Sequence, residues 1–191
     1  MGEKSVRCFV GIALDAATVA PVQQALSTLQ AEPWAKHVRW VETRNWHLTL
    51  AFLGEQSSPW LDLLHTQLLQ SMRTFKPSSA LVPGVQSRWI SGFPDASSRI
   101  VALEFHRSPM LLELKSVLDA VLLHLQFSPE TRDFRAHVTL GRVKREQQVH
   151  FDPVLCDVTV PLQQLVLFQS IQTAHGSEYD VLWSVPLPGC T

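Results

Sequence analysis

Short apolar runs alternate with stretches of helical periodicity along most of the chain. Residues 7–14 are almost wholly apolar, which predicts a strand buried on both faces. A helix is expected to open at Asp15 or Thr18 and to end near Gln30, because apolar residues recur there every three or four positions. The same reasoning predicts strands at 38–41 and 46–53, the second ending at Gly54, and a helix at about 58–75.

A segment rich in Pro, Gly and Ser, residues 77–98, interrupts this plan and is expected to link two halves of the chain. Within it, only residues 80–82 are predicted to form a strand. The plan then begins again, with a strand at 100–105, a helix capped by Ser108 and Pro109 and running to about Gln126, and a strand at 136–140. Further strands are expected at 158–160, 164–169 and 179–185.

The two halves have nearly the same spacing between the first strand and the His-bearing strand. From Cys8 to His47 is 39 residues (47 − 8), and from Ile100 to His137 is 37 residues (137 − 100). Two units of strand, helix and His-bearing strand therefore indicate an internal duplication within an α+β fold.

Both His-bearing strands carry the same pattern of four residues, His-apolar-Thr-apolar, at 47–50 and 137–140. In a strand, residues i and i+2 lie on one face and i+1 and i+3 on the other. Each pattern therefore places His47 beside Thr49, or His137 beside Thr139, on one surface, with apolar residues anchoring the opposite face. With 8 His and 11 Thr in 191 residues, chance predicts roughly 0.1 such matches. Two matches in equivalent positions therefore indicate a functional constraint.

A pair of imidazoles, one neutral and one protonated, can open a cyclic phosphodiester at neutral pH. One ring removes a proton from the attacking water, and the other protonates the departing ribose oxygen. The hydroxyls of Thr49 and Thr139 would hydrogen-bond the non-bridging phosphate oxygens. Two alternatives are weaker: solvent-facing sheet histidines, and a zinc pair, for which no third ligand has suitable spacing.

Composition limits the class of protein, its mode of nucleic-acid binding and its cellular compartment. The hydrophobic share of 46% and charged share of 17% are those of a globular protein, and a net charge of −1 excludes a general coat for nucleic acid. RNA would have to bind a local patch, for which Arg132, Arg135, Lys144 and Arg145 are candidates. Three cysteines without a metal spacing, and no membrane-length apolar run or signal peptide, predict a cytoplasmic protein.

The chain resembles the 2H phosphoesterase superfamily, and within it the bacterial and archaeal RNA 2′,3′-cyclic phosphodiesterases, also called 2′-5′ RNA ligase-like proteins. The resemblance rests on residues 45–54, NWHLTLAFLG, on residues 134–142, FRAHVTLGR, and on similar opening and closing strands at 7–12, 167–170 and 176–182. It covers nearly the whole chain. Ala136 departs from the family, whose members often carry Pro there, without changing the chemistry.

The resemblance implies a single domain over residues 1–191, with two intertwined, pseudo-symmetric lobes of antiparallel sheet, outer helices and a central cleft. Each lobe contributes one His-x-Thr strand to the cleft. The implied reaction is hydrolysis of a terminal RNA 2′,3′-cyclic phosphate to the 2′-phosphomonoester, with His47 as acid and His137 as base. No cofactor or metal is implied. The implied partner is an RNA end, with tRNA fragments among the candidates. The protein is expected to be a monomer and not to associate with a membrane.

Two further residues are candidates for substrate binding. Arg142 follows the second motif, where the family carries an Arg that could hold a phosphate, although a solvated turn would also explain its charge. Phe52 keeps phase with Leu48 and Leu50, which predicts a core position, but an aromatic ring near the strand end could stack on a base. Alternative substrates are 2′-5′ linked or small cyclic nucleotides, and the alternative class of protein is a non-catalytic RNA-end binding module.

Overall fold

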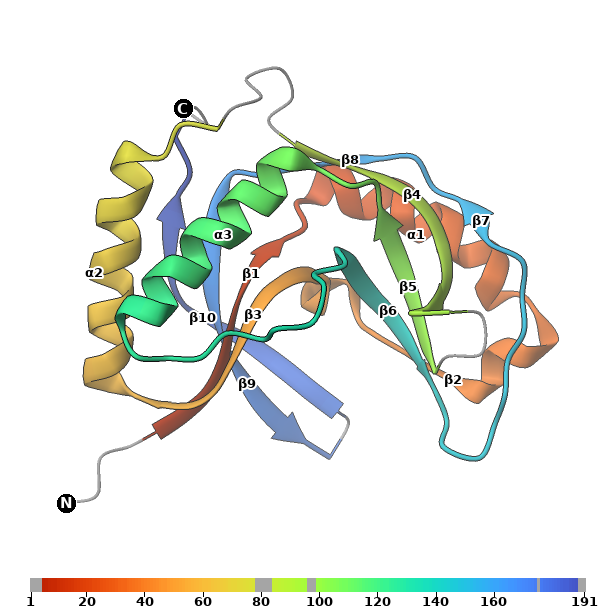
Figure 1. Cartoon of the computed structure of the whole chain (residues 1–191). Coiled ribbons are helices and arrows are strands. Elements are labelled where there is room, and N and C mark those ends of the chain that lie inside the picture. The colour runs from red at the N-terminus through yellow and green to blue at the C-terminus, as the bar shows by residue number, and fades with distance from the viewer. Residues whose placement is uncertain (1–4, 78–83, 96–98, 175, 189–191) are drawn as a thin grey trace.

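The computed structural model describes residues 5–77, 84–95, 99–174 and 176–188. These residues form three α-helices packed on one antiparallel sheet of ten strands (Figure 1). The helices are α1 (Ala16–Gln30), α2 (Ser58–Thr74) and α3 (Pro109–His124). The strands are β1 (Ser5–Ala13), β2 (Val38–Trp40), β3 (His47–Ser57), β4 (Gly84–Phe93), β5 (Ile100–Phe105), β6 (His137–Val143), β7 (Val154–Leu155), β8 (Thr159–Pro161), β9 (Gln164–Thr173) and β10 (Gly176–Pro186).

The sheet joins two halves at its centre. Its main path runs β10-β9-β1-β3-β6-β5-β4-β7, with β2 paired to β6 and β8 paired to β4. The halves meet where β3 pairs with β6, and Leu48 lies opposite Val138 at that junction. The two His-bearing strands are therefore neighbours at the middle of the sheet, although 90 residues separate His47 from His137 (137 − 47).

The helices lie outside the sheet and interleave the halves. Helix α2 contacts α3, β3 and β10, and in Figure 1 α2 and α3 lie beside β1, β9 and β10. Helix α1 follows β1 and is drawn behind β4 and β5 in the view of Figure 1. The predicted caps of α1 and α3 are confirmed: Asp15 accepts a hydrogen bond from the Thr18 amide at 2.8 Å, and Ser108 accepts one from the Leu111 amide at 3.3 Å. The α+β class and the antiparallel, pseudo-symmetric arrangement predicted from the sequence are confirmed.

The internal duplication extends to a distortion in the two His-bearing strands. In β3 the pairing with β1 skips Leu50, and in β6 the pairing with β5 skips Leu140. These are β-bulges at equivalent positions, and each leaves one residue of the strand unpaired. Burial follows the same order along both strands, from His47 to Leu53 and from His137 to Val143.

Two details differ from the sequence predictions, and one prediction is not tested. The segment 77–98 is not only a link, because residues 84–93 form β4, whose Val85 and Ile90 are fully buried. Gly and Ser were read there as loop residues, yet they serve close strand packing: a Cβ at Gly84 would lie 2.8 Å from the Val160 carbonyl oxygen. The strand predicted at 80–82 lies outside the described residues. Strand β3 does not end at Gly54 but continues through it, with Gly54 at φ +69°, to Ser57.

Among the described residues, none of the helices combines the length and the apolar character needed to cross a membrane. Cys8 and Cys156 are free thiols buried in the core.

Candidate active site

The two His-x-Thr pairs are half-buried on one face of β3 and β6, while the intervening apolar residues are buried on the other. Leu48, Leu50, Val138 and Leu140 are each 0–3% exposed. The alternation predicted for the motifs is thereby observed, and the polar pairs lie at the seam between the two halves of the sheet.

His47 lies among aromatic side chains of the first half. Its ring centroid is 4.5 Å from Phe9, 4.9 Å from Tyr179 in an edge-on arrangement, and 5.4 Å from Phe168. Phe9 and Phe168 form a small second core on this face of the sheet with Val166. Strand β1 is therefore buried on both faces, as its composition predicted. On one of those faces, Phe9 contacts the His47 ring.

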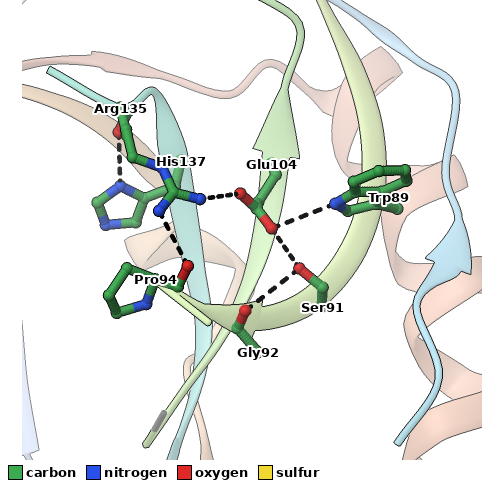
Figure 2. A network of polar contacts seen from close by, with 7 residues as sticks. All are labelled: Trp89, Ser91, Gly92, Pro94, Glu104, Arg135 and His137. Carbon is green, nitrogen blue, oxygen red and sulfur yellow. Dashed lines mark hydrogen bonds and ion pairs between the residues drawn. The ribbon is translucent and has the colours of Figure 1, made fainter. Parts of the chain in front are cut away.

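His137 lies beside charged and aromatic groups of the second half. Its ring stacks on Phe93 with centroids 4.0 Å apart, and the Arg135 guanidinium lies 4.7 Å from the Phe93 ring. Arg135 also donates to the Glu104 carboxylate at 2.9 Å and to the Pro94 carbonyl at 2.9 Å (Figure 2). Glu104 lies directly opposite His137 in the β5–β6 register.

The Glu104 carboxylate is itself held by two further donors. It accepts from the Trp89 indole at 3.2 Å and from the Ser91 hydroxyl, and its side chain is only 17% exposed (Figure 2). A mostly buried carboxylate that accepts from three donors is fixed in position. Glu104 therefore holds Arg135 in place, and Arg135 contacts the Phe93 ring that stacks on His137.

Backbone carbonyls determine which nitrogen of each imidazole carries hydrogen. Nδ1 of His47 lies 2.7 Å from the Asn45 carbonyl oxygen, and Nδ1 of His137 lies 3.0 Å from the Arg135 carbonyl oxygen. A carbonyl only accepts, so Nδ1 must donate and Nε2 is left to accept or release a proton. The same tautomer is thus imposed on both rings by the residue two positions earlier.

Asn45 does more than offer its carbonyl. Its side-chain amide donates to the Ser177 carbonyl at 3.2 Å, which ties the start of β3 to the β9–β10 hairpin. This contact explains physically why an Asn two residues before the histidine belongs to the motif.

The surroundings lower the affinity of both rings for a proton. Burial lowers the pKa of His47 to about 4; the Asn45 carbonyl opposes this, and the charges of His137 and Arg142 lower it further. Burial also lowers the pKa of His137, but there the Arg135 carbonyl and the Glu104 carboxylate oppose the shift while Arg135 and Arg142 add to it. A carboxylate thus supports a proton on His137, and none is among the causes acting on His47.

Phe52 lies on the site face and not in the core, so the core position predicted from its phase is wrong. The bulge at Leu50 inserts one residue, so Phe52 lies on the face opposite to the one that strict alternation predicts. Phe52 is 75% exposed and its ring centroid lies 6.0 Å from Phe9, which in turn contacts His47. The alternative of an aromatic surface near the histidines agrees with this position.

Arg142 occupies the position in β6 that Phe52 occupies in β3, each following its bulge. Its charge lowers the pKa of both histidines, so it acts on both halves of the site. The site thus has an arginine on one side and an exposed aromatic ring on the other. The bulge at Leu140 explains why Arg142 lies on the site face, because without it Arg142 would face the core.

Two hollows adjoin the histidines. A pocket of about 280 Å³ opens beside His47, lined largely by apolar groups such as Leu14, Val19 and Phe168. A narrower groove, between β2, β6 and the β9–β10 hairpin, begins at Arg142 and Tyr179. His47 lines the first hollow, and Arg142 and Tyr179 connect the second to the histidines.

The loop residues that were expected to form one basic patch differ in their contacts. Arg132 pairs with Glu130 at 2.6 Å, and Lys144 donates to the Lys36 carbonyl at 2.7 Å. Of the four candidates, Arg135 is the one tied to the histidines. Arg39, which sequence reasoning did not single out, instead lies opposite Arg142.

Sequence reasoning also missed the residues that contact the rings, namely Phe9, Glu104, Phe168 and Tyr179. Phe93, which stacks on the His137 ring, lies within the segment that was expected to be a link. The available signal was the polar Glu104 within an otherwise apolar strand, IVALEF. Within the described ranges, no three His, Cys, Asp or Glu side chains are grouped so as to hold a metal ion.

Comparisons with known proteins place this geometry among phosphoesterases. Residues 14–85 match the family described as LigT like Phosphoesterase. The chain is 30% identical over 188 residues to an RNA 2′,3′-cyclic phosphodiesterase of Archaeoglobus fulgidus, covering 93% of this chain and 98% of the relative. It is 29% identical over 160 residues to a protein of the same name from Thermotoga maritima, covering 78% and 80%.

Solved structures show the same fold. Escherichia coli LigT complexed with 3′-AMP superimposes with a TM-score of 0.72 at 24% identity, covering 97% of this chain and 99% of LigT. A protein of Thermus thermophilus gives a TM-score of 0.75 at 23% identity, covering 96% and 98%.

Proposed function

The chain belongs to the LigT-like family of 2H phosphoesterases, and we propose that it is an RNA 2′,3′-cyclic phosphodiesterase that forms a 2′-phosphomonoester. The observation that carries the proposal is the placement of two histidines on adjacent central strands. Each ring has its Nδ1 held by a carbonyl and its Nε2 available for proton transfer. A threonine lies on the same face beside each ring.

The reaction follows from these groups. A water attacks phosphorus while one imidazole removes its proton, and the bond from phosphorus to the ribose 3′ oxygen breaks as the other imidazole protonates that oxygen. Thr49, Thr139 and Arg142 hold the non-bridging oxygens, whose negative charge must be stabilised in the transition state. Phe52 offers its exposed ring to the terminal base. Protons and hydrogen bonds suffice for each of these steps, so no metal or cofactor is required.

We assign His47 as the acid and His137 as the base, as the family resemblance implies. With a pKa of about 4, His47 is neutral in the free protein near pH 7. The bound phosphodiester, which is an anion, must therefore raise the pKa of His47 for it to act as the acid.

A substrate with sulfur in place of the 3′ bridging oxygen tests this assignment, because a thiolate leaves without a proton. The variant that lacks the acid should recover most of its rate on this substrate, and the variant that lacks the base should not. Recovery by His137→Ala in place of His47→Ala would reverse the roles.

The central experiment uses an RNA that ends in a 2′,3′-cyclic phosphate and locates the phosphate in the product. We expect the 2′-phosphomonoester, in the presence of EDTA as well as in its absence. His47→Ala and His137→Ala should each lower kcat by roughly 10²–10⁴-fold in single-turnover assays. The double variant should lose less than the product of the two, since both rings serve one displacement. Thermal melts should show all three variants folded.

Other outcomes identify the alternatives. Tight binding of the cyclic end without turnover would indicate an RNA-end binding module. Turnover restricted to 2′-5′ linked or small cyclic nucleotides would keep the chemistry and change the substrate. Abolition by EDTA with rescue by a divalent ion would refute the two-histidine mechanism.

We also propose that the whole chain, residues 1–191, acts as one catalytic domain and as a monomer in the cytoplasm. The shared sheet and the single large core that includes residues of both halves support one domain. Two buried free thiols agree with a reducing compartment.

A further inference from the structure

Two arginines face each other across adjacent strands next to the histidines. Arg39 of β2 lies directly opposite Arg142 of β6, so both side chains lie on one face of the sheet. Like charges in this arrangement are destabilising. Within the described part of the chain, neither guanidinium takes part in an ion pair. An uncompensated pair of this kind suits an anionic ligand.

The two arginines line the narrow groove between β2, β6 and the β9–β10 hairpin. Arg39 reaches across this groove, with its Nη1 atom 3.9 Å from the point where a Cβ on Gly176 would lie. Two carboxylates, Glu42 and Glu178, also line the groove, but Arg44 lies 2.7 Å from the first and 3.7 Å from the second. The charge left over is therefore positive.

The groove leads away from the reaction site. Tyr179, which contributes to its wall, contacts His47, and Arg142 acts on both histidines. Its volume of about 90 Å³ is enough for a phosphate-sized group.

We propose that Arg39 binds the phosphodiester that joins the terminal nucleotide to the nucleotide before it, while the neighbouring Arg142 holds the reacting phosphate. The proposal rests on the proposed function, and it makes the preferred substrate an oligonucleotide end and not a mononucleoside cyclic phosphate. A guanidinium offers a planar fork of donors to two phosphate oxygens, which suits a backbone phosphate of any sequence.

The test compares two substrates, uridine 2′,3′-cyclic phosphate and the dinucleotide UpU with a 2′,3′-cyclic phosphate end. The second substrate adds the internucleotide phosphate and one nucleoside. We expect Arg39→Ala to lower kcat/KM on the order of 10-fold for the dinucleotide and to leave the mononucleoside unchanged. The dependence of log kcat/KM on log salt concentration should become shallower by about 0.7 for the dinucleotide, as for the loss of one phosphate contact.

Arg73→Ala is the matched control, because Arg73 is an exposed arginine in the last turn of α2, in the helix layer and not on the site face. It should behave as the wild type on both substrates. Equal losses on both substrates after Arg39→Ala would place Arg39 at the reacting phosphate or in the fold, and would overturn the proposal. No loss on either substrate would also overturn it.

A binding measurement separates this proposal from the proposed function. Wild-type protein that turns over neither substrate would refute the phosphodiesterase assignment. In that case, the fluorescence anisotropy of a short RNA ending in a 2′-phosphate would measure whether the groove binds RNA. Weaker binding by Arg39→Ala than by the wild type and Arg73→Ala, with a reduced salt dependence, would support the groove. Equal binding by all three proteins would refute it.

Discussion

Burial lowers the pKa of both site histidines, so acidification should destabilise this protein, and the size of the contribution follows for His47. Its pKa is lowered to about 4 in the folded protein, against 6.5 for an unperturbed histidine. The unfolded chain therefore binds a proton first as the pH falls, and stability is lost between pH 6.5 and pH 4 but is unaffected above pH 7. The loss amounts to about 1 kcal/mol at pH 6, about 2 kcal/mol at pH 5 and about 3 kcal/mol at pH 4.

Urea unfolding of the wild type and of His47→Gln at these pH values measures this contribution. Glutamine cannot titrate, so the difference between the two proteins should change by about 3 kcal/mol from pH 7 to pH 4, in favour of the variant at low pH. Inorganic phosphate should reduce the change for the wild type, because an anion near the ring raises its pKa. Parallel pH dependences for the two proteins would refute the argument that burial controls His47.

The remaining predictions concern groups around the histidines. Thr49→Ala and Thr139→Ala should each raise the barrier by about 2–4 kcal/mol in single-turnover hydrolysis without changing the melting temperature; unchanged rates would remove them from the oxyanion contacts. Glu104→Gln should lower the apparent pKa that His137 contributes to the kcat/KM profile, because the carboxylate supports the proton on that ring; an unshifted pKa would make Glu104 a purely structural residue. Phe52→Ala should raise KM on the order of 10-fold through lost base stacking, with little effect on stability because the ring is 75% exposed; a large melting loss would instead place Phe52 in the fold.

Local patterns in the sequence were sufficient to predict most elements. The helix caps at Asp15 and Ser108, the buried first strand and the two His-x-Thr strands all follow from chemistry within a few residues of each position. For the same reason, the pairing of each histidine with its threonine was determined by strand alternation alone. The duplication was visible as well, since it repeats this local pattern.

Composition was a poor guide where packing overrides propensity. Residues 84–93 contain Gly and Ser and were taken for part of a link, yet they form a strand that pairs with β5 on one side and with the short strands β7 and β8 on the other. Ser87 is fully buried there because its hydroxyl donates to the Cys156 carbonyl and accepts from the Val158 amide, contacts between segments about 70 residues apart. Nothing in the local sequence contains that information.

The face on which Phe52 and Arg142 lie was decided only by the tertiary structure. Each side chain follows a β-bulge, and a bulge exists only relative to a neighbouring strand, so counting along one strand could not detect it. The partners of the two rings have the same origin, because Glu104 reaches His137 through strand register and Tyr179 reaches His47 from a distant hairpin. The sequence by itself therefore identified the two histidines and their threonine neighbours, whereas the pairing of distant strands determined their surroundings and hence their affinity for protons.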